Sequence, residues 1–279
     1  MLVCSYPWPT KLNASLGAGL IGSHIVRAFL AAGCNVSVVD LAPGSPASLP
    51  ESSHLLYISG DISKTLGPAF DAAEAKFGTV ETCVAMASLD LSVLPQTESI
   101  CDMDPDTWRR VMDVNVTGTF LTARRWLQGI RSAVGSGQKL KNVGLVIMGS
   151  ESGTFGVRTM AAYAAGKSAV QAGLMLSLSQ DAPRIFPRAR VNAVAPGAVD
   201  TPRFREEMET YGAEWTYREA EATVGLARPV NGEEVARVVL GLASERWSSG
   251  VHGKVLGVDA GKMGVVLWSR DERGGRIEK

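Results

Sequence analysis

Short apolar runs alternate with amphipathic segments along most of this 279-residue chain, and this alternation limits the possible folds more than any other feature. The runs have the length of strands: 35–40, 55–58, 82–87, 144–148, 191–194 and 255–258. Segments with helical periodicity lie between them: 21–32, 68–77, 105–115, 118–134, 161–180 and 232–243. A strand, a helix and a second strand form the βαβ unit, which pairs its strands in parallel. The sequence therefore predicts an α/β fold, a single Rossmann-like domain whose parallel sheet of about seven strands is flanked by helices on both faces.

Three segments fit this pattern less well. Residues 11–15, before a glycine-rich loop, make a poor first strand, so we expect that edge of the sheet to be irregular. Residues 201–228 are polar and interrupted, which is typical of a helical excursion or a lid over a substrate site. Residues 262–279 form a tail with one apolar patch at 265–268. We treat 1–279 as one domain with a lid and a tail, and we expect Asn231 to cap the last long helix.

Composition excludes several classes of partner. Lys plus Arg equals Asp plus Glu at 28 each, so no basic excess favours nucleic acid or an anionic membrane. No run approaches the roughly 18 apolar residues of a membrane span, and the first residues do not resemble a signal peptide, which predicts a cytoplasmic protein. No histidine or cysteine spacing predicts a metal site. We expect the four scattered cysteines to be reduced packing residues: Cys4, Cys34, Cys83 and Cys101.

A glycine loop precedes the first predicted helix. Gly17, Gly19 and Gly22 match GxGxxG, and Asp40 lies 18 residues beyond Gly22 at a predicted strand end. Glycines let the backbone approach a pyrophosphate, and the helix that follows presents free N–H groups to it. Asp40 can accept hydrogen bonds from both adenosine ribose hydroxyls and would repel a 2′-phosphate, which favours NAD over NADP. The alternative is a tight turn that binds no ligand.

A second set of polar residues indicates proton transfer. Tyr163 and Lys167 are four residues apart in a predicted helix, so the phenol and the ammonium lie on one face. A cation there stabilises phenolate and lowers its pKa toward a value useful for acid–base catalysis. Ser150 follows the apolar run 144–148, at the strand edge where parallel sheets bind ligands.

Together these motifs resemble those of the short-chain dehydrogenase/reductase family over positions 12–261. The matching elements are the glycine loop, Asp61-Ile62, Asn115 in NVTG, Ser150, YAAGK at 163–167, RVNAVAPG at 190–197 with Thr201, and VDAG at 258–261. The resemblance implies that Tyr163 is the general acid/base and that Lys167 lowers its pKa and holds the nicotinamide ribose. It also implies that Ser150 hydrogen-bonds the substrate oxygen. Asn115 would hold a helix kink and a water that connects Lys167 to solvent.

The family pattern also implies a cofactor site and an assembly. The expected cofactor residues are Gly17, Gly19, Leu20, Ile21, Gly22, Asp40, Asp61, Ile62, Ala87, Asn115, Tyr163, Lys167, Pro196, Gly197, Val199 and Thr201. Of these, Asp61 and Ile62 would bracket the adenine, and Pro196, Gly197 and Thr201 would meet the nicotinamide. The family is typically homodimeric or homotetrameric, and we expect helices 105–134 and 161–180 to form the interface, with a further contact at 265–268.

The chain departs from the family pattern at two loops. The usual Thr-Gly that begins the glycine loop is Ser15-Leu16, and a leucine side chain resists positive φ. We expect a bent but usable loop; the alternative is a relic that no longer binds cofactor. The usual Asn-Asn-Ala-Gly is replaced by residues 85–88, AMAS, which places Met86 and Ser88 near the cofactor.

These features predict an NAD(H)-dependent oxidoreductase that interconverts a secondary alcohol and a ketone. The expected substrate pocket is Thr154, Phe155, Met160, Phe204, Met208 and Trp215. This lining suits an apolar small molecule, such as a cyclic or aromatic alcohol of natural-product type. Two alternatives stay open: a non-redox cyclase, dehydratase or isomerase on the same scaffold, and a cofactor-sensing protein without catalysis.

Overall fold

The computed structural model describes residues 3–6, 10–14, 19–64, 66–95 and 97–274. Its central strands form a parallel sheet of order β10-β7-β6-β5, and β3 pairs in parallel with β4 beside it. These strands span Val36–Asp40 (β3), Leu55–Ser59 (β4), Thr82–Ala85 (β5), Gly144–Met148 (β6), Arg190–Pro196 (β7) and Val255–Val258 (β10). Each predicted strand from residue 35 onward is therefore present, and the predicted Rossmann-like α/β fold is confirmed.

The N-terminal edge of the sheet is irregular, as expected, but in an unforeseen way. The segment before the glycine loop is β2 (Thr10–Ala14), which pairs antiparallel with β1 (Val3–Tyr6). In turn, β1 pairs antiparallel with β3 through Cys4 and Val36. A central parallel strand needs a nearly continuous apolar run, and the sequence TKLNA does not supply one. The single parallel sheet that the sequence predicts is thus divided into two four-stranded sheets, β2-β1-β3-β4 and β10-β7-β6-β5, and the first contains antiparallel pairs.

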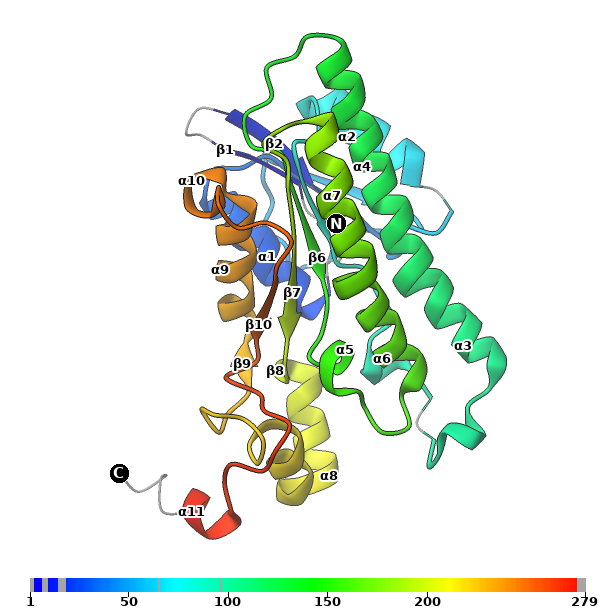
Figure 1. The fold of residues 1–279 in the computed structure, drawn as a ribbon, viewed down its shortest axis with the longest axis vertical. Helices are drawn as coiled ribbons and strands as arrows, with labels where there is room; N and C mark the ends of the chain where they lie inside the picture. The colour runs from blue at the N-terminus through cyan, green and yellow to red at the C-terminus, as the bar shows by residue number, and fades with distance from the viewer. Residues whose placement is uncertain (1–2, 7–9, 15–18, 65, 96, 275–279) are drawn as a thin grey trace.

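Helices cover both faces of the sheet (Figure 1). On one face α1 (Leu20–Ala31) packs against α9 (Gly232–Ala243). On the other lie α2 (Leu66–Phe77), α4 (Gly118–Gly135) and α7 (Met175–Ile185). The predicted cap of α9 is confirmed: Glu234 N–H donates to Asn231 Oδ1 at 2.9 Å, and Asn231 N–H donates to Glu234 Oε2 at 2.8 Å. No helix in the described part of the chain is long and apolar enough to cross a membrane.

Two of the long helices contain wide turns next to the site. A π-helical segment, η3 (Asp113–Thr117), joins α3 (Pro105–Met112) to α4. A second π-helical segment, η4 (Ala169–Leu174), joins α6 (Ala161–Ser168) to α7. Such segments are often found at functional sites. The shorter elements are η1 (Leu91–Val93), η2 (Ile100–Asp102), α5 (Ser152–Phe155), β8 (Val199–Asp200), β9 (Val230–Asn231), α10 (Glu245–Ser248) and α11 (Arg270–Gly274).

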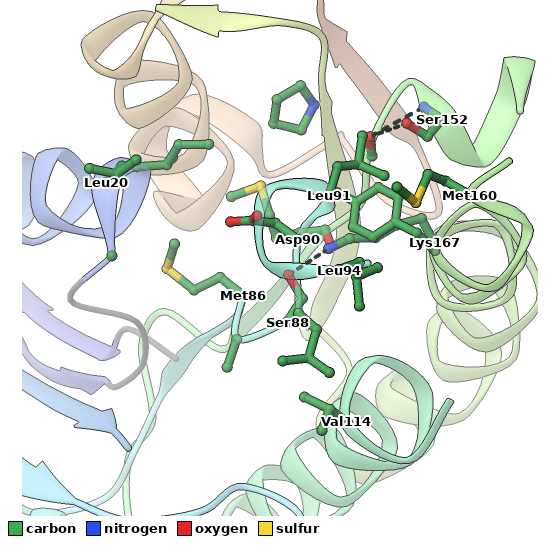
Figure 2. Close-up of a pocket in the computed structure, with 18 of the residues that line it drawn as sticks. Leu20, Met86, Ser88, Asp90, Leu91, Leu94, Val114, Ser152, Met160 and Lys167 are labelled. Atoms are coloured by element: carbon green, nitrogen blue, oxygen red, sulfur yellow. Dashed lines mark hydrogen bonds between the residues drawn. The ribbon is translucent and has the colours of Figure 1, made fainter. Parts of the chain in front are cut away.

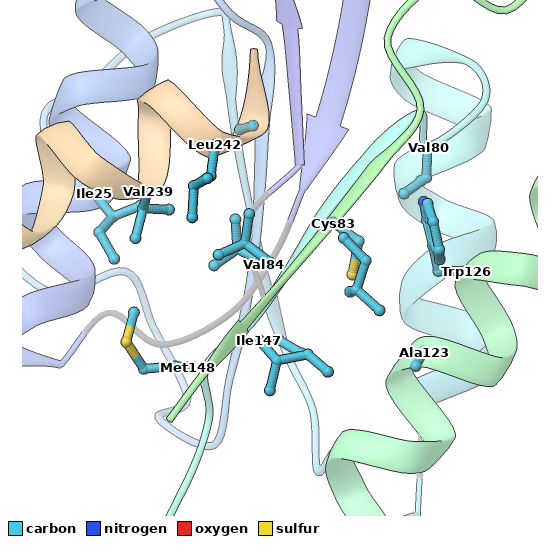
Figure 3. Close-up of a cluster of buried hydrophobic side chains, with 14 of the residues drawn as sticks. Ile25, Val80, Cys83, Val84, Ala123, Trp126, Ile147, Met148, Val239 and Leu242 are labelled. Carbon is cyan, nitrogen blue, oxygen red and sulfur yellow. The ribbon is translucent and has the colours of Figure 1, made fainter. Parts of the chain in front are cut away.

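The core fills the space between sheet and helices (Figure 3). Ile147 on β6 and Val84 on β5 are fully buried, as is Trp126 on α4. The indole N–H of Trp126 donates to the Glu81 carbonyl at 3.2 Å, so this large ring is buried with its polar atom satisfied. The core therefore fixes the strand ends from which the site is built.

Residues 201–228 form a helix at the end of the sheet, followed by turns. Helix α8 (Pro202–Ala220) begins at Thr201, whose Oγ1 accepts from Phe204 N–H at 3.1 Å, and it kinks at Gly212, where φ is 77°. The C-terminal segment 262–268 packs on the chain that follows α8. Trp268 Nε1–H donates to the Val224 carbonyl at 2.8 Å.

The cysteine prediction was wrong at one position. Cys34 is disulfide-bonded, whereas Cys83 and Cys101 are free thiols. The side chain of Cys4 lies outside the described residues. The antiparallel pairing of β1 with β3 brings the N-terminal segment beside the turn that carries Cys34, and sequence spacing alone did not predict that pairing.

Candidate active site

A large cleft opens where the parallel strands end, with a volume of about 1310 Å³. It runs from the start of α1, past the ends of β3, β5, β6 and β7, to α8. Its lining includes most of the predicted site residues: Gly19, Leu20, Ile21, Gly22, Asp40, Asp61, Ile62, Ala87, Ser150, Met160, Tyr163, Lys167, Pro196, Gly197, Val199, Thr201, Phe204 and Trp215. The predicted residue Gly17 lies outside the described part of the chain, as does Leu16.

The start of α1 has the donor set that a pyrophosphate needs. Gly19 is the N-cap and has no side chain with which to cap the helix, and the first turn holds no acidic residue. A Cβ added at Gly19 would meet nothing within 4 Å, so the backbone is open to the cleft. Uncapped N–H groups at a helix start attract anions. Asp40 ends β3 at the same cleft, and its Oδ1 accepts from Ala42 N–H at 3.1 Å. These residues fit the pyrophosphate and the ribose of a dinucleotide.

The predicted adenine end is well ordered by local contacts. Asp61 Oδ1 accepts from Ser63 N–H at 2.9 Å and from Ser63 Oγ–H at 2.6 Å. These bonds, with Lys64 Nζ 3.3 Å from Asp61 Oδ2, hold the Asp61 pKa below its usual value. Ile62 is buried against Gly118, where an added Cβ would lie 2.9 Å from Ile62 Cγ1. A side chain at 118 would therefore displace Ile62.

Ser150 is held from both sides in the loop after β6. Its N–H donates to Gln171 Oε1 at 2.8 Å, and its Oγ–H donates to Ser152 Oγ at 3.1 Å. Gln171 is only 3% exposed and also donates to Thr154 Oγ1 at 3.2 Å. Gln171 was not predicted; its one sequence signal is an amide in a helix eight residues after Tyr163.

Tyr163 and Lys167 both lie on α6 and are both buried, at 8% and 3% exposure. Lys167 Nζ lies 5.6 Å from the centroid of the Tyr163 ring. It donates to the Met148 carbonyl at 3.0 Å and to Ser88 Oγ at 3.2 Å, and Figure 2 shows Lys167 and Ser88 directed toward each other. The lysine therefore links α6 to the ends of β5 and β6.

Burial shifts both groups toward their neutral forms. Desolvation lowers the Lys167 pKa to about 8, against the opposing effect of Asp90. The Tyr163 pKa is raised to about 12, chiefly by desolvation; Asp90 and Glu151 also raise it, whereas a hydrogen bond with Ser150 lowers it. The lowered Tyr163 pKa that the spacing predicts is thus opposed by burial in this structure.

Asn115 lies in η3 rather than on the cleft wall. It is 1% exposed, its Oδ1 accepts from Leu89 N–H at 2.7 Å, and its Nδ2–H donates to the Leu89 carbonyl at 3.0 Å. These two hydrogen bonds hold the loop after β5 in place, and that loop lines the cleft. The predicted helix irregularity at Asn115 is therefore present as a π-helical turn.

Comparison with known proteins identifies the family. The family model described as enoyl-(acyl carrier protein) reductase matches residues 17–262. The chain belongs to the short-chain dehydrogenase/reductase family. It is 31% identical to cis-4-hydroxycyclohexanecarboxylate dehydrogenase of Sinomonas cyclohexanicum over 88% of this chain and 93% of that one. It is 30% identical to 2-(S)-hydroxypropyl-CoM dehydrogenase 3 of Xanthobacter autotrophicus, covering 89% and 94%.

Comparison with a solved structure confirms the fold. The 3-ketoacyl-(acyl-carrier-protein) reductase of Brucella melitensis, complexed with NADH, superimposes with a TM-score of 0.75 at 23% identity, covering 89% of this chain and 96% of that one. This likeness confirms the Rossmann-like fold, and the family model and the relatives place the chain among the oxidoreductases of the family.

The family loop that departs from Asn-Asn-Ala-Gly lies where the sequence predicted. Met86, Ala87 and Ser88 all line the cleft (Figure 2). Ser88 accepts the Lys167 hydrogen bond described above, so the serine at this short-chain dehydrogenase/reductase position contacts a predicted catalytic side chain.

The substrate end of the cleft is only partly as predicted. Met160, Phe204 and Trp215 line it, whereas the other three predicted residues do not line the cleft: Thr154, Phe155 and Met208. Tyr211 was missed; its ring centroid lies 5.6 Å from that of Trp215, which lies 5.3 Å from that of Phe204. Three glutamates were also missed in the lining: Glu151, Glu207 and Glu219.

Proposed function

We propose that this chain is an NAD(H)-dependent oxidoreductase that interconverts a secondary alcohol and a ketone on an apolar substrate, including cyclic ones. The observation that carries this proposal is the meeting of Ser150, Tyr163 and Lys167 in one cleft with Asp40 and the uncapped start of α1. Hydride chemistry needs the cofactor and a proton-transfer group at one place, and this cleft supplies residues for both.

The proposed roles follow from the side chains. When bound, NAD supplies the nicotinamide carbon that accepts the hydride of the alcohol. Tyr163 Oη takes the hydroxyl proton, and Ser150 Oγ–H donates a hydrogen bond to the substrate oxygen. Lys167 provides positive charge beside the phenol, and Asn115 positions the loop after β5. In ketone reduction Tyr163 returns the proton to the same oxygen.

Asp40 supports NAD rather than NADP. Its carboxylate ends β3 in the cleft, where it would accept from ribose hydroxyls and repel a 2′-phosphate. Asp61 and Ile62 are proposed to hold the adenine, with Pro196, Gly197, Val199 and Thr201 at the nicotinamide end.

The substrate class rests on the lining and on the relatives. Met160, Phe204 and Trp215 give an apolar wall, and one relative is a dehydrogenase of a hydroxylated cyclohexane ring. That relative acts on a carboxylate. In this chain Glu207 and Glu219 line the same end, so we propose that a substrate without negative charge is preferred.

A homodimer or homotetramer is proposed from the helices expected at the interface. Trp108, Phe120, Val134 and Leu176 lie on these helices and are each 38–47% exposed. In the patch at 265–268, Val265 and Val266 are more than 60% exposed. The cytoplasmic location stays a prediction from the sequence.

Parallel titrations of the purified protein with NADH and NADPH, followed by nicotinamide fluorescence, test the proposal. Micromolar binding of NADH with much weaker binding of NADPH is expected. Equal binding would refute the role of Asp40. If neither binds, and product still forms from a candidate substrate without nicotinamide, the chain is a non-redox enzyme and the proposal fails.

A further inference from the structure

A sheltered ion pair lies at the wall of the cleft: Glu151 lines the cleft, whereas its partner Lys262 does not. Lys262 Nζ is 3.3 Å from Glu151 Oε1, and the two side chains are 15% and 17% exposed. Most ion pairs in the described chain are more exposed; Arg109 and Asp106, for example, are 68% and 84% exposed. Glu151 directly follows Ser150, whereas Lys262 lies far later in the sequence, on the C-terminal segment.

The Glu151 carboxylate is wedged between two loops that line the cleft. The backbone N–H of Glu151 donates to the Pro196 carbonyl at 2.8 Å, and this bond joins the loop that carries Ser150 to the end of β7. A Cβ added at Gly197 would lie 2.8 Å from Glu151 Oε2 and 2.9 Å from Asp259 Cα. The carboxylate therefore occupies the space that a side chain at 197 would take, and its position affects both loops.

Lys262 connects this wedge to α8. It forms an antiparallel bridge with Val224, just after α8, and Met263 N–H donates to the Thr223 carbonyl at 2.8 Å. The backbone N–H of Lys262 donates to Asp259 Oδ1 at 3.3 Å. The lysine is thus held by its backbone while its ammonium reaches Glu151.

Charged groups from several parts of the chain surround the Glu151–Lys262 pair. Lys262, Asp259 and Glu219 all act electrostatically on Glu151. On the other side, Glu151 and Asp90 act on Tyr163, which also lies beside Lys167. Farther from the pair, Lys262 lowers the pKa of Glu219, and Glu207 raises it. Glu207 in turn forms an ion pair with Arg203 at 3.4 Å. Without Lys262, the carboxylate next to Ser150 would lose its ion-pair partner, and its electrostatic effect on Tyr163 would no longer be offset by the ammonium.

We propose that Lys262 is a positioning residue that holds the Glu151 carboxylate and offsets part of its charge, so that the C-terminal segment influences the pH at which Tyr163 transfers its proton. This inference rests on the proposed function, because it requires Tyr163 to be the acid/base. It assigns a role in the reaction to a residue that does not line the cleft.

The test is the pH profile of kcat/KM for alcohol oxidation in four proteins: wild type, Lys262→Met, Glu151→Gln and the double variant. An unpaired carboxylate disfavours the phenolate form of Tyr163. Lys262→Met is therefore expected to shift the rising limb of the kcat/KM profile to higher pH, by about half a pH unit or more. Glu151→Gln leaves the Lys262 ammonium without this partner, which favours the phenolate form of Tyr163. This variant is expected to shift the rising limb to lower pH. The double variant is expected to return close to wild type. Arg188→Met, which breaks the distant pair with Glu245, is the control and should leave the limb in place.

Opposite shifts in the two single variants support the proposal. If the pair has only a structural role, both single variants should have a lower Tm and an unshifted rising limb, and this result would overturn the proposal. Shifts of the same sign in the two variants would overturn it as well. If Lys262→Met does not fold, the downward shift of Glu151→Gln decides, and its absence overturns the proposal. Wild-type activity that survives Tyr163→Phe would instead remove the proposed function itself.

Discussion

The two ends of the cleft are built in different ways. Ser150, Tyr163 and Lys167 are less than 9% exposed and stand on a strand end and a helix that belong to the core. The substrate end stands on α8, which is kinked at Gly212 and fastened by the C-terminal segment. The buried end is where packing enforces geometry, and the α8 end is where side chains can change without disturbing the sheet.

The largest effect is expected at the buried end. Lys167→Met should lower kcat by about 100-fold or more, because it removes the positive charge beside Tyr163. Lys254→Met, on an exposed lysine outside the cleft, is the matched control. Unchanged turnover in Lys167→Met would show that the buried pair is structural.

The same lysine should leave a signature in stability against pH. Its folded-state pKa is lowered to about 8 from 10.5, so between these values the unfolded chain binds more protons at this position. The wild type therefore carries an unfavourable contribution below pH 8 that is relieved as the pH rises toward 10. Chemical denaturation at pH 7 and pH 9.5 should show that wild type gains stability relative to Lys167→Met at the higher pH. A constant difference would mean that the lysine is not desolvated.

A paired substitution sharpens the comparison between the two ends. Ile147→Ala on β6 removes a fully buried side chain and should lower the free energy of unfolding by about 2–5 kcal/mol. Trp215→Ala on α8 should cost less stability while raising KM, with kcat less affected, because the ring lines the substrate end. Urea denaturation and steady-state kinetics on both variants provide the measurement. Equal losses of unfolding free energy in Ile147→Ala and Trp215→Ala would contradict the distinction between the buried end and the α8 end of the cleft.

The smallest effect is expected from substrate charge at the α8 end. Uncharged cyclohexanols should have a kcat/KM about 10-fold above that of the matching carboxylates, and Glu219→Gln should narrow this ratio. Glu209→Gln, on the same helix but outside the cleft, should not change it. A preference for the carboxylate in wild type would contradict the assignment of this end.

The comparison also explains what the sequence could predict. The strands, the α9 cap and the Ser150–Tyr163–Lys167 set are encoded by local periodicity and short spacing, so they were predictable. Contacts such as Lys167 with Ser88, 79 residues apart, depend on packing that no local pattern records. The disulfide at Cys34, the support of Ser150 by Gln171 and the Glu151–Lys262 pair were missed for the same reason. The lining at α8 was only partly predicted: Phe204 and Trp215 line the cleft as expected, Tyr211 was missed, and Met208 does not line it.

The most direct test of the central claim is turnover and NADH binding measured together in Tyr163→Phe, with Tyr217→Phe as the control outside the cleft. The account predicts that NADH binding is retained in both, and that turnover falls by about 100-fold or more only in Tyr163→Phe. Turnover that persists in Tyr163→Phe at the wild-type rate would contradict the assignment of Tyr163 as the acid/base.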